Sequence, residues 1–387
     1  MSNKEISRRQ FIIGTGAMSA AVVAGLAGCT SSSSSSAASA SASASSASAS
    51  ASASASASAS ASSAAAAKTQ KITDLRGAEV EVPTEINKIV DLWHAHCQVI
   101  LMLGAGDKLI GTTDIFKKRP WANVAYPRLS EVEALVLGSG AGEVNYEECL
   151  KLEPDVVFAS DNNVTETARS KGLTTVNVAF QDYDGLRADV ALTGEILGGE
   201  AKERAEAWKK ILDENIALVE ERMKDVSTEN RTRVLHIANA NNFTKVDGIN
   251  CIVDEWIKLA GGVNALTVDG NLTDVTMEDI VASDPDMIII GSANAEAIAK
   301  LKADEAWTGL KAVQNGAVYA NPSGVFAWDR YSGEEALQVL WAAKLLNPEK
   351  FADINIEQET KDFYKLFYGC ELTDDQVQRI LTGENPA

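Results

Sequence analysis

The chain has few of the side chains on which most enzyme chemistry depends. It holds three His among 387 residues, and it has no nucleophile elbow, no His-Glu-x-x-His motif and no phosphate-binding loop. Basic residues are also outnumbered by acidic ones, 35 against 54, which gives a formal net charge of −19. An acidic surface argues against nucleic acid and anionic lipid as partners. The sequence therefore predicts a binding protein that is not an enzyme and does not bind nucleic acid.

Large apolar side chains are missing from a long N-terminal stretch. Residues 30–67 are all Ser or Ala except Thr30. Burial therefore cannot offset the entropy that ordering these residues would cost. We interpret residues 29–67 as a flexible tether that begins at Cys29. A silk-like strand, which the period-two Ser-Ala alternation permits, is the alternative.

The residues before this tether have the order of an export signal. Arg8 and Arg9 precede a short apolar run over 12–26, which leads into Leu-Ala-Gly-Cys29. The run is shorter than the roughly 20 residues that a membrane-spanning helix needs. We interpret residues 1–28 as a twin-arginine lipoprotein signal peptide. Lipidation of Cys29 would hold the protein on the outer face of the cytoplasmic membrane, and ordinary cleavage is the alternative.

The rest of the chain contains one α/β pattern twice. Segments 145–160 and 276–291 each combine an acidic helix start, a Pro-Asp turn and an apolar strand, and Glu147 aligns with Glu278. Apolar strand candidates alternate with helical stretches on both sides of the midpoint; they are 89–92, 109–113, 156–160, 175–178, 234–237, 287–290 and 317–320. Such alternation predicts parallel α/β sheets, and its duplication predicts two similar lobes.

A long helix is expected between the two halves. Apolar residues recur at spacings of three and four along 200–226, without Pro or Gly, which corresponds to about 40 Å of helix. The predicted fold class is α/β, with two Rossmann-like lobes joined by a long rigid α-helix and a ligand cleft between the lobes. The predicted limits are 68–185 for the first lobe, 186–230 for the interlobe region and 231–387 for the second lobe. A hairpin is expected within 72–83.

Three loops are expected to face the cleft, because ligands of open α/β sheets bind beyond the carboxyl ends of the strands. These loops are 93–97, 238–251 and 321–333. Their candidate ligand-binding residues combine aromatic, amide, imidazole and guanidinium groups; they are Trp93, His94, His96, Asn242, Phe243, Phe326, Trp328, Arg330 and Tyr331. This mixture suits a large, flat or anionic ligand. Packing of each aromatic side chain within its own lobe is the alternative.

The His-x-His pair in the first loop leaves three roles open. His94 and His96 extend from one side of an extended segment, and neutral imidazole is a common metal ligand. They could therefore bind a metal or haem iron, contact a ligand without coordinating it, or serve the local structure. No intrinsic cofactor is predicted. The cysteines that would remain after lipidation are predicted to form no structural disulfide; they are Cys97, Cys149, Cys251 and Cys370.

Several stretches, taken together, resemble the substrate-binding lipoproteins of ABC importers for iron-siderophores, haem and cobalamin. The stretches agree in order and spacing; they are Ile-Thr-Asp-Leu-Arg-Gly at 72–77, 102–111, 152–155, 256–264, 307–313 and 329–332. The resemblance implies a monomeric protein that delivers a metal chelate to a permease with its ATPase. It also implies that Glu147 and Glu278 dock on permease arginines, although composition alone reads them as helix-start acids.

The first loop departs from this family pattern, because His-Ala-His-Cys is unusual there. The identity of the chelate is therefore left open, with a ferric siderophore, haem, cobalamin or a similar complex as candidates. A cell-surface sensor or adhesin on the same fold is the alternative function. A metal-dependent hydrolase built on His94 and His96 is a further alternative.

Overall fold

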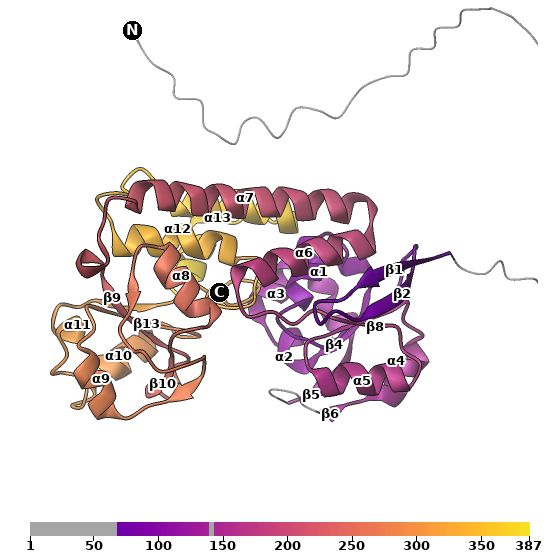
Figure 1. Ribbon diagram of the computed structural model, residues 1–387, viewed down its shortest axis with the longest axis horizontal. Helices are drawn as coiled ribbons and strands as arrows, with labels where there is room; N and C mark the ends of the chain where they lie inside the picture. Colours follow the sequence, from indigo (N-terminus) through magenta and orange to yellow (C-terminus); the bar gives the residue numbers. More distant parts are fainter. Residues whose placement is uncertain (1–67, 139–142) are drawn as a thin grey trace, which may run out of the picture. The chain divides into compact units, whose positions relative to one another are not determined.

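The computed structural model describes residues 68–138 and 143–387, which belong to one compact unit (Figure 1). The unit has two α/β lobes, each built on a sheet of its own, as the sequence predicted. The predicted signal peptide, Cys29 and the predicted tether lie outside the described residues. No helix in the described ranges is both long and apolar enough to cross a membrane.

The first lobe contains a hairpin and a sheet with the strand order β6-β5-β4-β3-β7-β8. The strands are β1 (Thr69–Thr73), β2 (Glu79–Pro83), β3 (Ile89–Asp91), β4 (Leu109–Thr113), β5 (Glu133–Leu137), β6 (Glu143–Val144), β7 (Val156–Ala159) and β8 (Thr175–Asn177). Strands β3, β4, β5, β7 and β8 pair in parallel, whereas β6 is antiparallel to β5. The helices of this lobe are α1 (Cys97–Met102), α2 (Asp114–Lys117), α3 (Pro120–Ala125), α4 (Tyr146–Leu152) and α5 (Asn162–Ser170), with 3-10 turns η1 (Gly106–Lys108) and η2 (Pro127–Glu131).

The second lobe repeats this plan with a sheet in the order β12-β10-β9-β13-β14, and β11 also pairs with β9. Its strands are β9 (Arg233–Ile237), β10 (Lys245–Asp247), β11 (Val263–Asn264), β12 (Thr273–Asp274), β13 (Met287–Ile290) and β14 (Val318–Ala320). Strands β9, β13 and β14 pair in parallel, whereas β10 pairs antiparallel with both β9 and β12. Its helices are α8 (Ile252–Leu259), α9 (Met277–Ser283), α10 (Ala295–Ala303) and α11 (Lys311–Gln314), and η3 (Thr228–Asn230) precedes β9.

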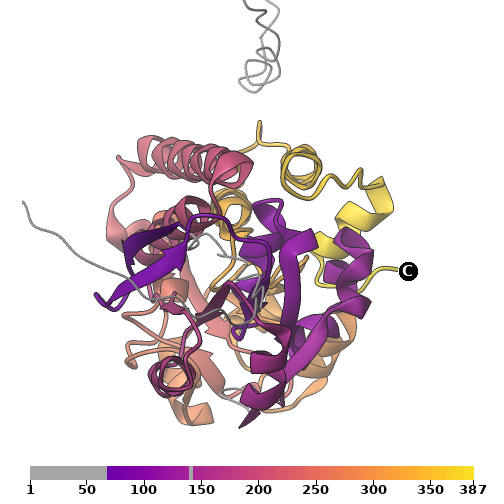
Figure 2. The same cartoon turned by 90° about the vertical axis from the view of Figure 1, so that its right-hand side faces the viewer.

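A layer of longer helices connects the lobes (Figures 1 and 2). These helices are α6 (Tyr183–Leu197), α7 (Gly199–Met223), α12 (Glu335–Leu346) and α13 (Ile356–Tyr368), and the shorter α14 (Asp374–Leu381) follows α13 in the chain. Helix α7 is the predicted interlobe helix, and it packs on both α6 and α12. It ends at Met223, before the predicted end at residue 226. Gly198 separates it from α6, and Gly199 begins it; both have positive φ angles that side-chain-bearing residues adopt at a cost.

Helix α7 is fixed to the second lobe by one large side chain. Trp208 is fully buried, and its Nε1–H donates to the carbonyl oxygen of Gly333 at 2.7 Å. Two turns further along α7, Asn215 Nδ2 donates to the carbonyl oxygen of Ala336 at 2.7 Å. Truncating a buried Trp of this kind costs about 3–5 kcal/mol. The helix therefore holds the third cleft loop and α12 in place rather than acting as a loose linker.

The duplicated segments form the same local structure in both lobes. Asn145 caps α4 and Thr276 caps α9, in each case by accepting a hydrogen bond from the backbone N–H three residues later. Both helices end at a left-handed residue, Glu153 or Asp284, directly before a Pro. Proline then prevents the helix from continuing. The repeat predicted from sequence is therefore a repeated helix–turn–strand unit, α4–β7 and α9–β13.

All seven strands expected from the sequence are present, with ends that differ by a residue or two. Five strands were not expected: β5, which has five residues, and the shorter β6, β10, β11 and β12. Several of them are only two or three residues long, which is too short for a periodic apolar pattern.

Candidate functional site

A pocket of about 320 Å³ lies at the carboxyl ends of the first lobe's strands. Residues 92–94 follow β3, residues 160–161 follow β7 and residues 179–181 follow β8, and all three segments line it. Tyr331 of the third cleft loop lines the same pocket from the second lobe. The pocket therefore occupies the place that the strand-end rule assigns to a ligand.

Three aromatic rings from both lobes form one wall of this pocket. The centroid of Trp93 lies 5.5 Å from that of Phe180 and 5.7 Å from that of Tyr331, and Phe180 and Tyr331 are 5.7 Å apart. The Tyr331 hydroxyl donates to Gln181 Oε1 at 3.1 Å and accepts from Asn271 Nδ2 at 2.6 Å. Tyr331 has φ +56°, a left-handed conformation that costs a non-Gly residue about 1 kcal/mol or more. Such strain at a pocket wall is typical of functional positions.

His94 lines the pocket as a neutral imidazole. Burial, together with the positive charge of Arg119, lowers its pKa to about 4. At neutral pH the ring therefore offers one donor and one acceptor. Its centroid lies 5.7 Å from that of Phe326, so this predicted loop residue reaches the same corner from the second lobe.

Arg119 lies in that corner, between the pocket histidine and the second lobe. Its guanidinium carbon is 3.9 Å from the centroid of Phe326, a cation–π contact. Its Nε is shielded from solvent and has no hydrogen-bond partner. Burial lowers the pKa of Arg119 to about 10, opposed by the charges of Asp329 and Glu334, so the group stays charged at neutral pH. Arg119 thus places positive charge and one unused donor next to His94, although it is not itself one of the residues that line the pocket.

His96 does not reach the pocket. Its ring is fully buried, with Nδ1 2.7 Å from Asp91 Oδ2 and Nε2 2.9 Å from Thr193 Oγ1. Nε2 also lies 3.4 Å from Asp189 Oδ1. Both ring nitrogens therefore have partners within the protein, in β3 and α6, and the structure separates the two histidines of the predicted pair.

Arg330 of the third loop is also occupied by its own lobe. Its NH2 group lies 2.6 Å from Asp247 Oδ2 and 3.0 Å from Asp329 Oδ2. Burial alone would lower the pKa of Arg330, but these two carboxylates raise it overall. His236 completes the cluster, with Nδ1 2.8 Å from Asp247 Oδ2.

The remaining predicted ligand contacts lie away from the pocket. Asn242 is exposed, and its amide oxygen accepts from the backbone N–H and the hydroxyl of Thr244. Phe243 packs edge-on against Trp307, with ring centroids 6.0 Å apart. Trp328 is fully buried. Ligand contact by these residues stays a prediction, which the geometry of the pocket does not favour.

The two aligned glutamates take equivalent places. Glu147 is the second residue of α4, Glu278 is the second residue of α9, and both side chains are exposed. Neither is needed to cap its helix, since the preceding Asn or Thr performs that role. They are therefore available to a partner, one on each lobe.

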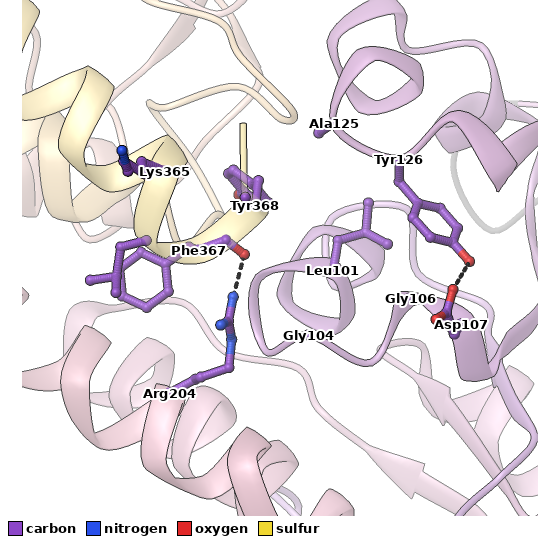
Figure 3. A pocket seen from close by; sticks show the side chains of 12 residues that line it. Leu101, Gly104, Gly106, Asp107, Ala125, Tyr126, Arg204, Lys365, Phe367 and Tyr368 are labelled. Atoms are coloured by element: carbon purple, nitrogen blue, oxygen red, sulfur yellow. Dashed lines mark hydrogen bonds between the residues drawn. The ribbon is translucent and has the colours of Figure 1, made fainter. Parts of the chain in front are cut away.

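A second pocket, of about 330 Å³, lies where α1 and η1 meet α3, α7 and α13 (Figure 3). Its charged and polar groups are already used. Arg204 donates to the carbonyl oxygens of Met102 and Phe367, and the Tyr126 hydroxyl donates to Asp107. Since the volumes of the two pockets are similar, the place of the first pocket at the strand ends, with residues from both lobes, favours it as the binding site.

Within residues 68–138 and 143–387, no group of three or more His, Cys, Asp or Glu side chains is placed to hold a metal ion. The four described cysteines are free thiols. Burial raises the pKa of Cys149 to about 11, so that thiol stays protonated. Metal coordination by His94 stays a prediction, and a metal held there would need further ligands of its own.

Three contributors to the site were missed in the sequence. Phe180 and Gln181 follow the strand predicted at 175–178, so the strand-end rule that selected the other loops could have found them. Arg119 had a weaker signal, an Arg directly before the Pro that begins α3. Its place in the cleft depends on how the α2–α3 connection folds, which the local sequence does not show.

Comparison with known proteins gives consistent relatives. A family model described as periplasmic binding protein matches residues 89–324. The molybdate-binding protein MolA of Haemophilus influenzae is 28% identical over 336 residues, which cover 80% of this chain and 93% of MolA. The Fe(3+)-citrate-binding protein YfmC of Bacillus subtilis is 28% identical over 199 residues, covering 49% of this chain and 60% of YfmC.

A solved structure supports the same assignment. The periplasmic solute binding protein of Veillonella parvula superimposes with a TM-score of 0.71 at 29% identity, covering 81% of this chain and 97% of that protein. The family match spans more than half of the chain and includes the main sheet of each lobe and the pocket residues from Leu92 to Gln181. The chain therefore belongs to the periplasmic binding protein family, whose members bind small solutes for ABC importers.

Proposed function

We propose that this protein captures a compact anionic metal complex outside the cytoplasmic membrane and delivers it to the permease of an ABC importer. One observation carries the proposal: the charged Arg119 lies beside the neutral His94 without a carboxylate partner of its own. A guanidinium recognises carboxylate and other oxyanion groups through paired hydrogen bonds. A neutral imidazole next to it can donate to the same solute or accept from it without adding charge.

The aromatic wall supports a metal complex with organic ligands. Trp93, Phe180 and Tyr331 supply apolar contact area, while Gln181 and Asn271 supply polar groups at its edge. A volume of about 320 Å³ is at the lower end for ligand pockets. It favours a small ferric chelate over the larger haem or cobalamin. The similarity to a Fe(3+)-citrate-binding protein agrees with this class.

An inorganic oxyanion is the second candidate, favoured by the similarity to a molybdate-binding protein over most of the chain. The same arginine would recognise it, because a metal oxyanion also presents oxygens that accept hydrogen bonds. The aromatic wall would then exclude water rather than contact the solute. The two candidates share anionic metal chemistry and differ in size.

Export and docking complete the proposed function. Under this proposal, residues 1–28 direct export, Cys29 carries the lipid anchor, and Glu147 and Glu278 contact basic residues of the permease. Matched acidic points on the two lobes suit a partner with two-fold symmetry. The exposed positions of both glutamates support this role.

The test is a tryptophan-fluorescence titration of the protein with ferric citrate, a hydroxamate ferric siderophore, haem, cobalamin and molybdate. We expect saturable quenching by one of them. Arg119→Gln should weaken that affinity at least tenfold, about 1.4 kcal/mol, whereas Arg128→Gln should leave it unchanged. Arg128 is a suitable control because it is an exposed arginine of the same lobe, paired with Asp107. Equal affinities for the two variants would contradict the assigned role of Arg119.

A further inference from the structure

Each lobe contains a fully buried histidine that lies between two carboxylates from different elements. In the first lobe, His96 bridges Asp91, at the end of β3, and Asp189, on α6. The hydroxyl of Thr193, one turn further along α6, is hydrogen-bonded to Nε2, the ring nitrogen that also faces Asp189. Neither Asp189 oxygen has a hydrogen-bond partner, so the nearby ring is the group that compensates its charge.

The second lobe has a cluster of the same chemistry. His236 lies in β9, with Nδ1 2.8 Å from Asp247 Oδ2 on β10 and Nε2 3.4 Å from Asp329 Oδ2 in the third loop. Arg330 adds a second cation to this cluster through ion pairs with both carboxylates. All three of these acidic and imidazole side chains are buried.

Both clusters connect directly to residues that form the pocket wall. Asp91 Oδ1 accepts a hydrogen bond from the backbone N–H of Trp93 at 3.0 Å. In the other lobe, Asp329 and Arg330 immediately precede Tyr331. Each buried histidine is therefore one side chain away from an aromatic residue of the wall.

We propose that His96 and His236 are positioning residues of the pocket, each tying the loop that carries its lobe's wall residue to a second element of that lobe. The proposal rests on the proposed function only in treating Trp93 and Tyr331 as walls of the binding site. A neutral imidazole has a single N–H donor. A protonated ring can donate from both nitrogens. Its positive charge is then compensated by a carboxylate on each side of the ring. For His96, hydrogen bonds to Asp91 and Thr193 fix the ring plane, and with it the loop. For His236, a hydrogen bond to Asp247 and an ion-pair contact with Asp329 do the same.

A ligand-free measurement tests the assignment, by fluorine NMR of the protein labelled with 5-fluorotryptophan. Trp93 reports on the first cluster. Trp256 reports on the second, because its ring contacts His236 and its Nε1–H donates to the carbonyl oxygen of Asp329. The resonances are assigned with Trp93→Phe and Trp256→Phe. We expect His96→Gln to shift or broaden the Trp93 resonance and leave that of Trp256 in place, and His236→Gln to do the reverse.

Two further variants keep the test decisive if His96→Gln does not fold. Asp189→Asn retains the ring and the side-chain shape, and it should move the Trp93 resonance in part. The double variant His96→Gln/Asp189→Asn removes the uncompensated carboxylate, so it should fold. Because it still lacks the bridging ring, its Trp93 resonance should stay shifted from that of wild type. A Trp93 resonance unmoved in Asp189→Asn and in the double variant would overturn the proposal. Simultaneous shifts of both reporters in every variant would also overturn it, because they would indicate general destabilisation.

Affinity supplies the second readout, with ferric citrate and molybdate as probes. His96→Gln or the double variant should weaken the affinity for whichever probe binds wild type at least tenfold, at a temperature where the variant is fully folded. Unchanged affinity together with a moved Trp93 resonance would overturn the positioning role. Absence of binding to wild type would contradict the proposed solute class alone, because the fluorine spectra need no ligand.

Discussion

The two lobes share one α/β plan, yet their cleft faces use the same residue types in opposite ways. In the first lobe, Arg119 has a shielded Nε without a partner and lies beside a pocket. In the second, Arg330 is held by Asp247 and Asp329 within its own lobe. An arginine on a cleft loop is therefore not an anion site by itself. The carboxylates around it decide whether it binds a solute or stabilises the loop.

The same contrast occurs within one loop, over two residues. His94 is kept neutral by burial, with a pKa of about 4. Burial would also lower the pKa of His96, but the charges of Asp189 and Asp91 raise it to about 10. One histidine therefore faces the pocket, and the other stabilises the loop that carries it.

The largest effect, a loss of solute uptake, is expected from the two glutamates that occupy equivalent places in the lobes. Replacing Glu147 and Glu278 together by Ala should abolish solute uptake by cells, because each lobe would lose its contact with the permease. Solute affinity of the purified protein should stay unchanged. Uptake assays with the labelled solute measure the first effect, and fluorescence titration measures the second.

A control variant should lose two negative charges from the surface of α7, where no partner is proposed to bind. Glu206 and Glu220 are exposed residues of α7, and their double replacement by Ala should leave uptake at the wild-type level. Normal uptake by the Glu147/Glu278 variant would rule out docking through these residues. The single variants show whether one lobe contributes more than the other.

The next effect contrasts the two arginines. Arg330→Met should lower the free energy of unfolding by about 3–5 kcal/mol, because it leaves two buried carboxylates with one imidazole between them. Arg119→Met should change it by less than about 1 kcal/mol, because the arginine has no ion pair to lose and the methionine keeps the contact with Phe326. Urea unfolding followed by circular dichroism gives both values. Similar losses in the two variants would contradict the contrast between the lobes.

Much of this architecture could be predicted from the sequence. The strands β4 and β13 match their predicted limits, because each is an apolar or small-residue run flanked by helix signals. The helix α7 could be predicted from its periodicity. The duplicated helix–turn–strand unit was visible because its Pro-Asp turns and acidic helix starts are local features.

The site could be predicted only in part. Trp93, His94 and Tyr331 were identified by strand-end position, and they line the pocket. The separate roles of His94 and His96 could not be predicted, because Asp189, which faces His96, is 93 residues away in the chain. Arg330 had the right residue type and loop position, but Asp247, 83 residues before it, occupies its guanidinium. Long-range partners of this kind leave no local signal.

A smaller effect concerns the pH dependence of stability. His94 should contribute to it on the acid side of pH 6.5, and His96 on the alkaline side. The folded pKa of His94 is about 4, below the unfolded value near 6.5. Between these values the unfolded chain binds more protons, so stability falls as the pH drops from 6.5 to 4, by up to about 3 kcal/mol. The folded pKa of His96 is about 10. Its contribution is therefore fully present below pH 6.5 and is lost as the pH rises towards 10.

Urea unfolding across pH 4–10 measures both sides of this profile. His94→Gln should lose less stability than wild type between pH 6.5 and 4, so the difference between the two proteins should change with pH on the acid side and stay constant on the alkaline side. Other carboxylates also titrate below pH 5, but they are common to both proteins and cancel in the difference. Parallel profiles for wild type and His94→Gln would show that His94 is not held neutral.

The smallest effect should come from the hydroxyl that joins the two lobes at the pocket. Tyr331→Phe keeps the ring contacts with Trp93 and Phe180 but removes the bonds to Gln181 and Asn271. Each hydrogen bond of this kind makes a net contribution of about 0.5–1.5 kcal/mol to the free energy of unfolding. We therefore expect unfolding to become easier by about 1 kcal/mol, with a change in solute affinity of less than tenfold.

Comparison with two other variants shows which part of Tyr331 matters. Tyr331→Ala removes the ring as well, so it should weaken solute binding more than Tyr331→Phe does, even though the left-handed backbone strain is unchanged. Tyr319→Phe, in β14, controls for loss of a tyrosine hydroxyl from the same lobe. If Tyr331→Phe and Tyr331→Ala weakened binding equally, the hydroxyl bridge between the lobes would be the feature that the solute requires. The aromatic wall would then be secondary, and the difference between the two cleft faces would lie in their polar groups alone.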